Sequence, residues 1–143
     1  MNTLVIDASV AIKWVVEEEG TDEALALRGT AKLIAPDLLV AECANILWKK
    51  VRRGELLADE AGFGARLLQA ADMELLPTRP LLENATLMAM ELNHPAYDCL
   101  YLELATRHGC RLVTADEQLV KKLVQSARFS HRDKAILLRD ATR

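Results

Sequence analysis

Thr3-Leu4-Val5-Ile6-Asp7 is a short run of β-branched and apolar residues that ends in an acid. Such a run indicates a buried strand, because a parallel strand with helices on both faces is apolar along its whole length. Ser9 follows two residues later and is expected to cap a helix that continues to Val15 or Val16. The chain is therefore predicted to begin with a strand that turns directly into a helix.

Strands and helices are expected to alternate along the rest of the chain. Further apolar runs predict strands at residues 33–35, 73–76, 110–114 and 135–138. Helices are predicted at residues 22–30, with Thr21 as the cap, and at residues 36–53, 59–71, 81–92, 97–108 and 117–124. Gly54 would take the C-terminal capping position of the long helix that precedes it. This alternation predicts the α/β class, with a parallel sheet covered on both faces, in one domain of residues 1–143.

Composition favours a cytoplasmic protein. The chain has 143 residues, the size of one domain, and 51% of them are apolar, enough for a core. Its first residues carry no basic cluster typical of a secretion signal, and no apolar run is long enough to span a membrane. Cys43, Cys99 and Cys110 are odd in number and lack C-x-x-C spacing. We therefore expect buried thiols in a reducing compartment rather than a zinc site.

The net charge of −3 is distributed unevenly along the chain. Residues 1–120 hold 11 Lys/Arg and 19 Asp/Glu, whereas residues 121–143 hold 7 Lys/Arg and 2 Asp/Glu. This asymmetry fits either a solvated C-terminal segment or a basic face that binds nucleic acid. The basic residues expected to contact phosphates are Lys49, Lys50, Arg52, Arg53, Lys121, Lys122, Arg128, Arg132 and Lys134.

Four acids occupy positions where chemistry is expected. Asp7 ends the first strand and Asp116 follows the strand at 110–114, and ligands of open α/β sheets bind beyond the carboxyl ends of the strands. Glu42 and Asp98 lie in helices that are otherwise apolar, where an unpaired carboxylate is costly. One such acid alone is explained by a salt bridge or a helix cap, and Asp98 and Asp116 both stand near helix starts. Four separate caps or bridges are a less economical explanation.

Carboxylates that converge on one pocket raise one another's pKa values unless a cation neutralises them. Mg²⁺ prefers oxygen ligands and is held by few carboxylates, waters and substrate phosphates. Two such ions about 3.5–4 Å apart activate a water and stabilise the leaving oxygen in phosphodiester hydrolysis. Ser9, Asn45 and Thr114 would stand beside the acids, and their neutral polar groups are expected to orient ligands or water.

Four short motifs occur in a defined order: Asp7-Ala8-Ser9 after the first strand, Glu42-x-x-Asn45 in the long helix, Tyr97-Asp98 at the start of an apolar helix, and Thr114-Ala115-Asp116 after a strand. Together they resemble the PIN domain. The stretch Tyr97-Asp98-Cys99-Leu100-Tyr101-Leu102-Glu103-Leu104-Ala105 is especially similar to toxins of the VapBC type. The resemblance extends from Thr3 to about Leu138.

This resemblance implies a sheet of about five parallel strands, with Mg²⁺ or Mn²⁺ held by Asp7, Glu42, Asp98 and Asp116, and endonucleolytic cleavage of RNA. Ser9, Asn45 and Thr114 would be auxiliary residues. Proteins of this kind are usually homodimers bound by a short antitoxin whose tail covers the active site. Glu117 directly follows Asp116, whereas some relatives place a further acid slightly later, so its membership of the metal site stays open.

Other functions fit less well. Haloacid-dehalogenase phosphatases need a second Asp two residues after the first, where this chain has Ser9, and receiver domains need an acidic pair and a Lys near the last strand. No Gly-rich loop indicates nucleoside triphosphate chemistry. None of His94, His108 and His131 is expected to be catalytic. The remaining alternative is a PIN-like scaffold that binds RNA or a partner without cutting.

Overall fold

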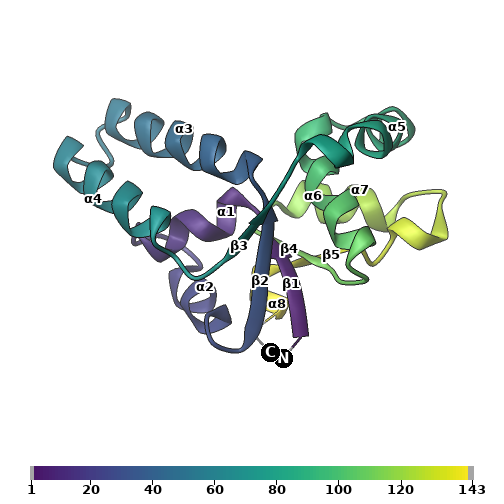
Figure 1. Ribbon diagram of the computed structural model, residues 1–143, viewed down its shortest axis with the longest axis horizontal. Helices are drawn as coiled ribbons and strands as arrows, with labels where there is room; N and C mark the ends of the chain where they lie inside the picture. Colours follow the sequence, from purple (N-terminus) through teal and green to yellow (C-terminus); the bar gives the residue numbers. More distant parts are fainter. Residues whose placement is uncertain (1, 142–143) are drawn as a thin grey trace.

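The computed structural model describes residues 2–141, without the side chain of Phe129. Its centre is a five-stranded sheet in the order β3-β2-β1-β4-β5, in which every neighbouring pair of strands is parallel (Figure 1). The strands are β1 (Asn2–Ile6), β2 (Ala31–Pro36), β3 (Glu74–Leu76), β4 (Leu112–Thr114) and β5 (Ala135–Leu137). The predicted α/β class and its five parallel strands are confirmed.

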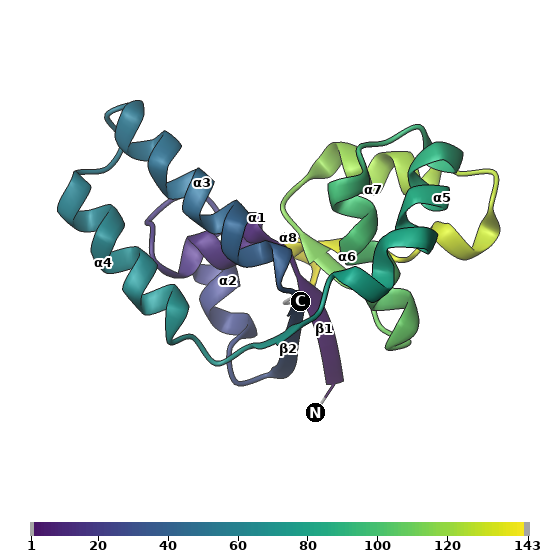
Figure 2. The same cartoon turned by 45° about the horizontal axis from the view of Figure 1, so that its top comes forward.

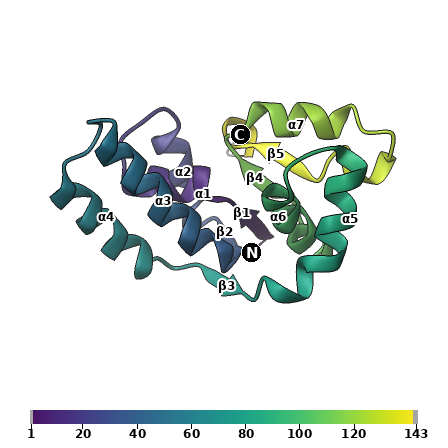
Figure 3. The same cartoon turned by 90° about the horizontal axis from the view of Figure 1, so that it is seen from above.

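Helices flank the sheet on two sides. They are α1 (Ala8–Ala11), η1 (Ile12–Trp14), α2 (Thr21–Leu27), α3 (Leu38–Arg52), α4 (Ala58–Gln69), η2 (Arg79–Leu81), α5 (Leu82–Leu92), α6 (Ala96–Arg107), α7 (Glu117–Val124), η3 (Phe129–His131) and α8 (Leu138–Ala141). Figures 2 and 3 show α1 to α4 on one side of the central strands and α5 to α7 on the other. Within the described residues, no helix is long and apolar enough to cross a membrane.

β1 lies at the middle of the sheet and of the core. It pairs with β2 on one edge and with β4 on the other, while α6 packs across β1 and β2. Val5 and Ile6 at its end are fully buried, as are Leu112 and Val113 of β4. The continuous apolar run that predicted a buried strand is explained by this position, because both faces of β1 are covered.

Two expected helix caps are wrong. Asp7, not Ser9, is the N-cap of α1, and its carboxylate accepts a hydrogen bond from the Val10 N–H at 3.3 Å. The chain turns into α1 so directly after β1 that Ser9 already lies in the first turn. Gly20, not Thr21, is the N-cap of α2. The Thr21 hydroxyl instead donates to the Val16 carbonyl at 3.0 Å, which ties α2 to the segment before it.

Helix ends elsewhere follow the sequence closely. α3 ends where predicted, and Gly54 just beyond it has φ +76°, a left-handed conformation that glycine adopts without steric cost. The first helix is shorter than expected, because α1 ends at Ala11 and passes into the 3-10 turn η1, which ends at Trp14. The short helix α8 was not predicted, since the last strand was expected to run on to Leu138.

Candidate active site

The order of the strands places two of the four acids side by side. The chain leaves β1 toward β2 on one edge of the sheet, whereas β4 and β5 lie on the other edge, so the switch point is between β1 and β4. Ile6 pairs with Val113, which brings the next residues, Asp7 and Thr114, to the same level. Ligand sites of open parallel sheets form at such switch points.

Asp7 is buried, with 7% of its surface exposed. Its carboxylate accepts hydrogen bonds from the Ser9 hydroxyl at 2.5 Å, from the Val10 N–H and from the Thr114 hydroxyl. Burial raises the pKa of Asp7 to about 6, these hydrogen bonds oppose the rise, and the charge of Asp98 adds to it. The fold thus holds Asp7 in place by hydrogen bonds, although burial destabilises its ionised form.

Glu42 and Asp98 come from α3 and α6, which stand on either side of the carboxyl end of β2 (Figure 1). Glu42 is half-buried, and burial followed by the charge of Asp98 raises its pKa, while a hydrogen bond from Tyr101 opposes this. Asp98 therefore acts electrostatically on both Asp7 and Glu42. We call these three residues the acidic cluster.

The acidic cluster lacks the cationic partners that other acids have. Within residues 2–141, neither Asp7 nor Glu42 forms an ion pair with Lys or Arg. By contrast, Glu18 pairs with Lys13 and Lys50, both at 2.8 Å. The explanation of Asp7 and Glu42 as structural salt bridges is therefore excluded for the described part of the chain.

Asp116 is exposed and has a structural role at the start of α7. It is the N-cap of α7, where its carboxylate accepts from the N–H groups of Gln118 and Leu119 at 3.0 and 3.2 Å. Its own N–H donates to the Thr114 hydroxyl at 3.1 Å, which links it to Asp7 through one residue. The cap that the sequence allowed for Asp116 is present, whereas Asp98 does not cap α6, whose N-cap is Pro95.

The auxiliary residues Ser9, Thr114 and Asn45 differ in their contacts and in their burial. Ser9 donates to Asp7 and accepts from the Ala115 N–H at 3.1 Å, so one hydroxyl joins the ends of β1 and β4. Thr114 is fully buried beside Asp7. Asn45 lies one turn after Glu42 on α3 and is exposed. Glu117 is exposed and pairs with Arg139 of α8 at 2.7 Å, so it has a cationic partner that the acidic cluster lacks.

Two residues of the site were missed by the sequence analysis. The Tyr101 hydroxyl donates to Oε1 of Glu42 at 2.5 Å, and Nε2 of His94 lies 2.6 Å from Oδ2 of Asp98. Burial, then the contact with Glu42, raises the pKa of Tyr101, so the phenol stays protonated. Two signals could have identified them: Tyr101 follows Asp98 at helical spacing on α6, and His94 precedes it by four residues.

Comparison with known proteins gives the family. The model of the PIN domain matches residues 4–123 of this chain. The chain belongs to the PIN domain family. It is 34% identical over 125 residues to Ribonuclease VapC3 of Pyrobaculum aerophilum. The aligned residues cover 83% of this chain and 93% of the relative. The crystal structure of PAE2754 from the same organism has the same fold, with a TM-score of 0.71, 23% identity, and coverage of 99% of this chain and 94% of that one.

The donor chemistry of this PIN domain fits a hard divalent cation. Within residues 2–141, no three His, Cys, Asp or Glu side chains already form a complete set of metal ligands. A preformed set is not required, because Mg²⁺ keeps several waters and takes one or two carboxylates. Cys43 on α3 would not compete, since burial and then the charges of Glu42 and Asp7 raise the pKa of its thiol to about 12.

The basic residues of the PIN domain do not form one continuous face. Those of α3 lie at the end of the helix remote from the sheet, and those that follow residue 120 lie on the side of α7 (Figure 1). Several are engaged within the protein: Lys50 with Glu18, and Arg128 with Glu91 at 3.0 Å. Arg53 and Lys121 are exposed. They are therefore better placed for phosphate contacts than Lys50 or Arg128.

Proposed function

We propose that residues 1–143 form one PIN nuclease domain that cleaves RNA endonucleolytically with the help of Mg²⁺ or Mn²⁺. The observation that carries this proposal is the acidic cluster of Asp7, Glu42 and Asp98 near the carboxyl ends of the strands. Within residues 2–141, neither Asp7 nor Glu42 forms an ion pair with Lys or Arg. Similarity to a relative named Ribonuclease VapC3 supports RNA as the substrate.

The acidic cluster would hold the cation, and Asp116 would add a further carboxylate. A bound divalent cation would lower the pKa of a water and stabilise the charge on the leaving oxygen. Ser9 and Thr114 keep the Asp7 carboxylate facing the end of β4, because both hydroxyls bond to it. Asn45, exposed one turn from Glu42, is placed to contact the substrate or a water from α3.

Histidine is not proposed as a general base. His94 is hydrogen-bonded to Asp98. His131, the last residue of η3, is buried against α5 and α6. His108 is exposed at the C-cap of α6, at the opposite end of the helix from Asp98. Water activation would therefore be supplied by the cation that the carboxylates would hold.

The test is cleavage of a single-stranded RNA carrying a fluorophore and a quencher, with the purified chain in Mg²⁺, in Mn²⁺ and in excess chelator. We expect internal cleavage with either metal and none in chelator. Binding of the RNA without cleavage under any metal condition would overturn the enzymatic proposal in favour of a non-catalytic scaffold.

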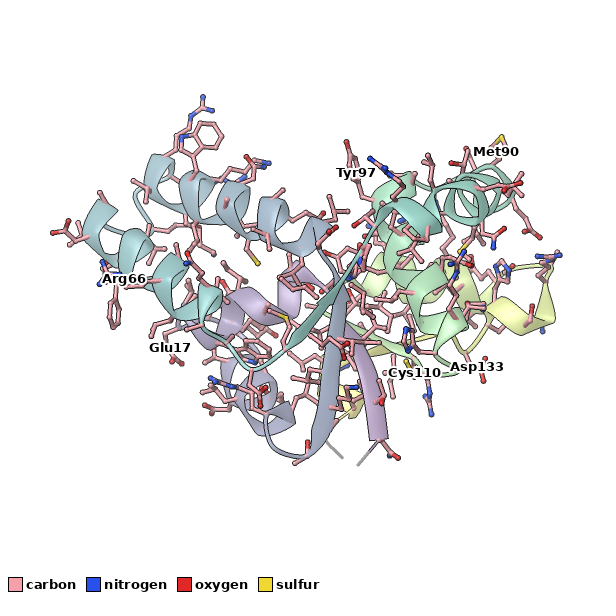
Figure 4. All side chains as sticks on the ribbon, viewed as in Figure 1. Glu17, Arg66, Met90, Tyr97, Cys110 and Asp133 are labelled. Atoms are coloured by element: carbon pink, nitrogen blue, oxygen red, sulfur yellow. The ribbon has the colours of Figure 1, made fainter. Side chains whose placement is uncertain are left out.

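We further propose that the protein is the cytoplasmic toxin of a toxin–antitoxin pair and forms a homodimer. Exposed apolar side chains on two helices support partners: Leu57, Phe63 and Leu67 on and beside α4, and Leu82, Leu87 and Met90 on α5. Figure 4 shows Met90 on the outer side of α5, away from the sheet. Exposed apolar side chains mark protein interaction sites where they gather into one patch. Co-purification with the product of a neighbouring small reading frame checks the pairing.

Phosphate contacts are tested by the salt dependence of RNA binding, measured in chelator so that the RNA stays intact. We expect Arg53→Gln and Lys121→Gln each to weaken binding and to lower the slope of log K against log salt by about one, because each removes one phosphate contact. Lys50→Gln is the matched control, since its charge is already paired with Glu18. Slopes that equal the parent's in the first two variants would contradict these contacts.

A further inference from the structure

Glu42 and Asp98 each form a hydrogen bond with a side chain that is neither Lys nor Arg. Tyr101 bonds to Oε1 of Glu42, and His94 bonds to Oδ2 of Asp98. Both donors are secluded from solvent: Tyr101 is 1% exposed and the His94 side chain 10%. By contrast, the enclosed acids Glu18 and Glu103 meet Lys or Arg: Glu18 meets Lys13 and Lys50 at 2.8 Å, and Glu103 meets Arg107 at 2.9 Å. The different partners of Glu42 and Asp98 call for a physical reason.

We propose that Tyr101 and His94 are positioning residues, which hold Glu42 and Asp98 in the orientation at which both carboxylates bind one divalent cation. This inference rests on the proposed function and adds to it two residues that touch ligands rather than the cation. Groups that hydrogen-bond to metal ligands fix their orientation, and their loss typically lowers metal affinity or activity about 10–100-fold.

Charge explains why neither partner is Lys or Arg. A Lys or Arg would cancel the carboxylate charge on which cation binding depends. The Tyr101 phenol leaves that charge in place, and Tyr101 and His94 each contact only one oxygen of their carboxylate. Oε2 of Glu42 and Oδ1 of Asp98 therefore stay open to a cation. The phenol can only donate here, because burial and the contact with Glu42 keep it protonated.

α6 couples the two sides of the site. Asp98 and Tyr101 are three residues apart on this helix, so they project from the same face. The Tyr101 hydroxyl reaches across to Glu42 on α3, fifty-nine residues earlier in the chain. One helix thus supplies a proposed ligand and also the donor that fixes a second ligand on the opposite helix (Figure 1).

The backbone around His94 is constrained on both sides. Asn93 ends α5 in a left-handed conformation, with φ +50°, and Pro95 is the N-cap of α6. The Asn93 carbonyl also accepts from the Lys122 ammonium at 3.0 Å. Nδ1 of His94 is buried without a hydrogen-bond partner, and Nε2 lies 2.6 Å from Oδ2 of Asp98. The imidazole is therefore held toward Asp98 by its surroundings.

The experiment measures Mn²⁺ binding by calorimetry without RNA, and then RNA cleavage as a function of Mn²⁺ concentration. Tyr101→Phe removes only a hydroxyl, and its control is Tyr97→Phe, an exposed tyrosine at the upper end of the same helix (Figure 4). His94→Phe removes the donor, whereas His94→Gln keeps an N–H group that can reach Asp98. His108→Phe, at the exposed C-cap of α6, is the control for loss of a histidine that does not contact Asp98.

We expect Tyr101→Phe and His94→Phe to weaken Mn²⁺ binding about tenfold or more, and His94→Gln and both controls to stay within about threefold of the parent. Cleavage by Tyr101→Phe should recover at saturating Mn²⁺. Unchanged or tighter Mn²⁺ binding in Tyr101→Phe and His94→Phe, with a parent that binds Mn²⁺ and cuts RNA, would overturn the positioning inference alone. A parent that neither binds Mn²⁺ nor cuts RNA would overturn the proposed function and this inference with it.

Discussion

Asp7→Asn is expected to lower RNA cleavage by more than about a hundredfold, beyond the range seen for groups that only support metal ligands. The same change should leave the metal-free protein as stable as the parent at pH 7.5, or more stable. The reason is that Asp7 is buried beside the charge of Asp98 and has its pKa raised to about 6. An asparagine keeps the oxygen that accepts from Val10 and removes the buried charge.

The stability difference should depend on pH in a defined direction. The folded-state pKa of Asp7, about 6, lies above the ordinary value of 3.8 for an aspartate side chain. Ionised Asp7 therefore destabilises the fold fully above pH 6, and this penalty disappears as the pH falls toward 4. A difference of about 2 pKa units corresponds to at most about 3 kcal/mol. The free energy of unfolding of Asp7→Asn should thus rise relative to the parent's between pH 4 and pH 6, and the difference should stay constant at higher pH.

The measurement is urea unfolding of parent and Asp7→Asn in chelator between pH 4.5 and pH 8. Asp72→Asn is a control, because Asp72 is exposed in the loop before β3 and should change neither stability nor cleavage. If the parent were more stable than Asp7→Asn at pH 8, by a margin that grows with pH, Asp7 would be an acid whose charge stabilises the fold. That result would contradict the destabilising buried charge proposed for Asp7.

Most of the fold was predictable because the strands follow local apolar runs and most helices have local start and stop signals. Gly54 and Pro95, for example, mark helix boundaries that the structure confirms to within a residue or two. The cap of α1 was not predictable in the same way. Asp7 and Ser9 are both good capping residues, and only the point at which β1 leaves the sheet selects Asp7. The tertiary structure, not the local sequence, made that choice.

The candidate site was predictable to the extent that it depends on strand ends. Parallel strands carry their terminal residues to one edge, which brings Asp7 to Thr114 and close to Asp116. The contact of Tyr101 with Glu42 joins residues on two helices far apart in the sequence, so no local pattern encodes it. The pairing of Glu117 with Arg139 has the same cause, since it depends on how α8 returns to α7.

Asp98 and Glu103 provide the sharpest contrast between a functional and a structural acid, since both lie on α6. Asp98→Asn is expected to lower cleavage by more than about a hundredfold and to leave the melting temperature in chelator close to the parent's, because an asparagine oxygen still accepts from His94. Added Mn²⁺ should stabilise the parent by mass action and Asp98→Asn much less.

Glu103→Gln should behave in the opposite way. The Glu103 side chain is 7% exposed and accepts from Arg107 at 2.9 Å and from Asn84 at 3.0 Å, so loss of its charge should cost about 1–3 kcal/mol. Its cleavage, assayed below the melting temperature, should stay within about tenfold of the parent, and its response to Mn²⁺ should be retained. Both variants are melted in chelator and in Mn²⁺. If Asp98→Asn melted well below the parent in chelator and kept the Mn²⁺ response, Asp98 would be the structural acid, and the site would have to be rebuilt around Asp7 and Glu42 without it.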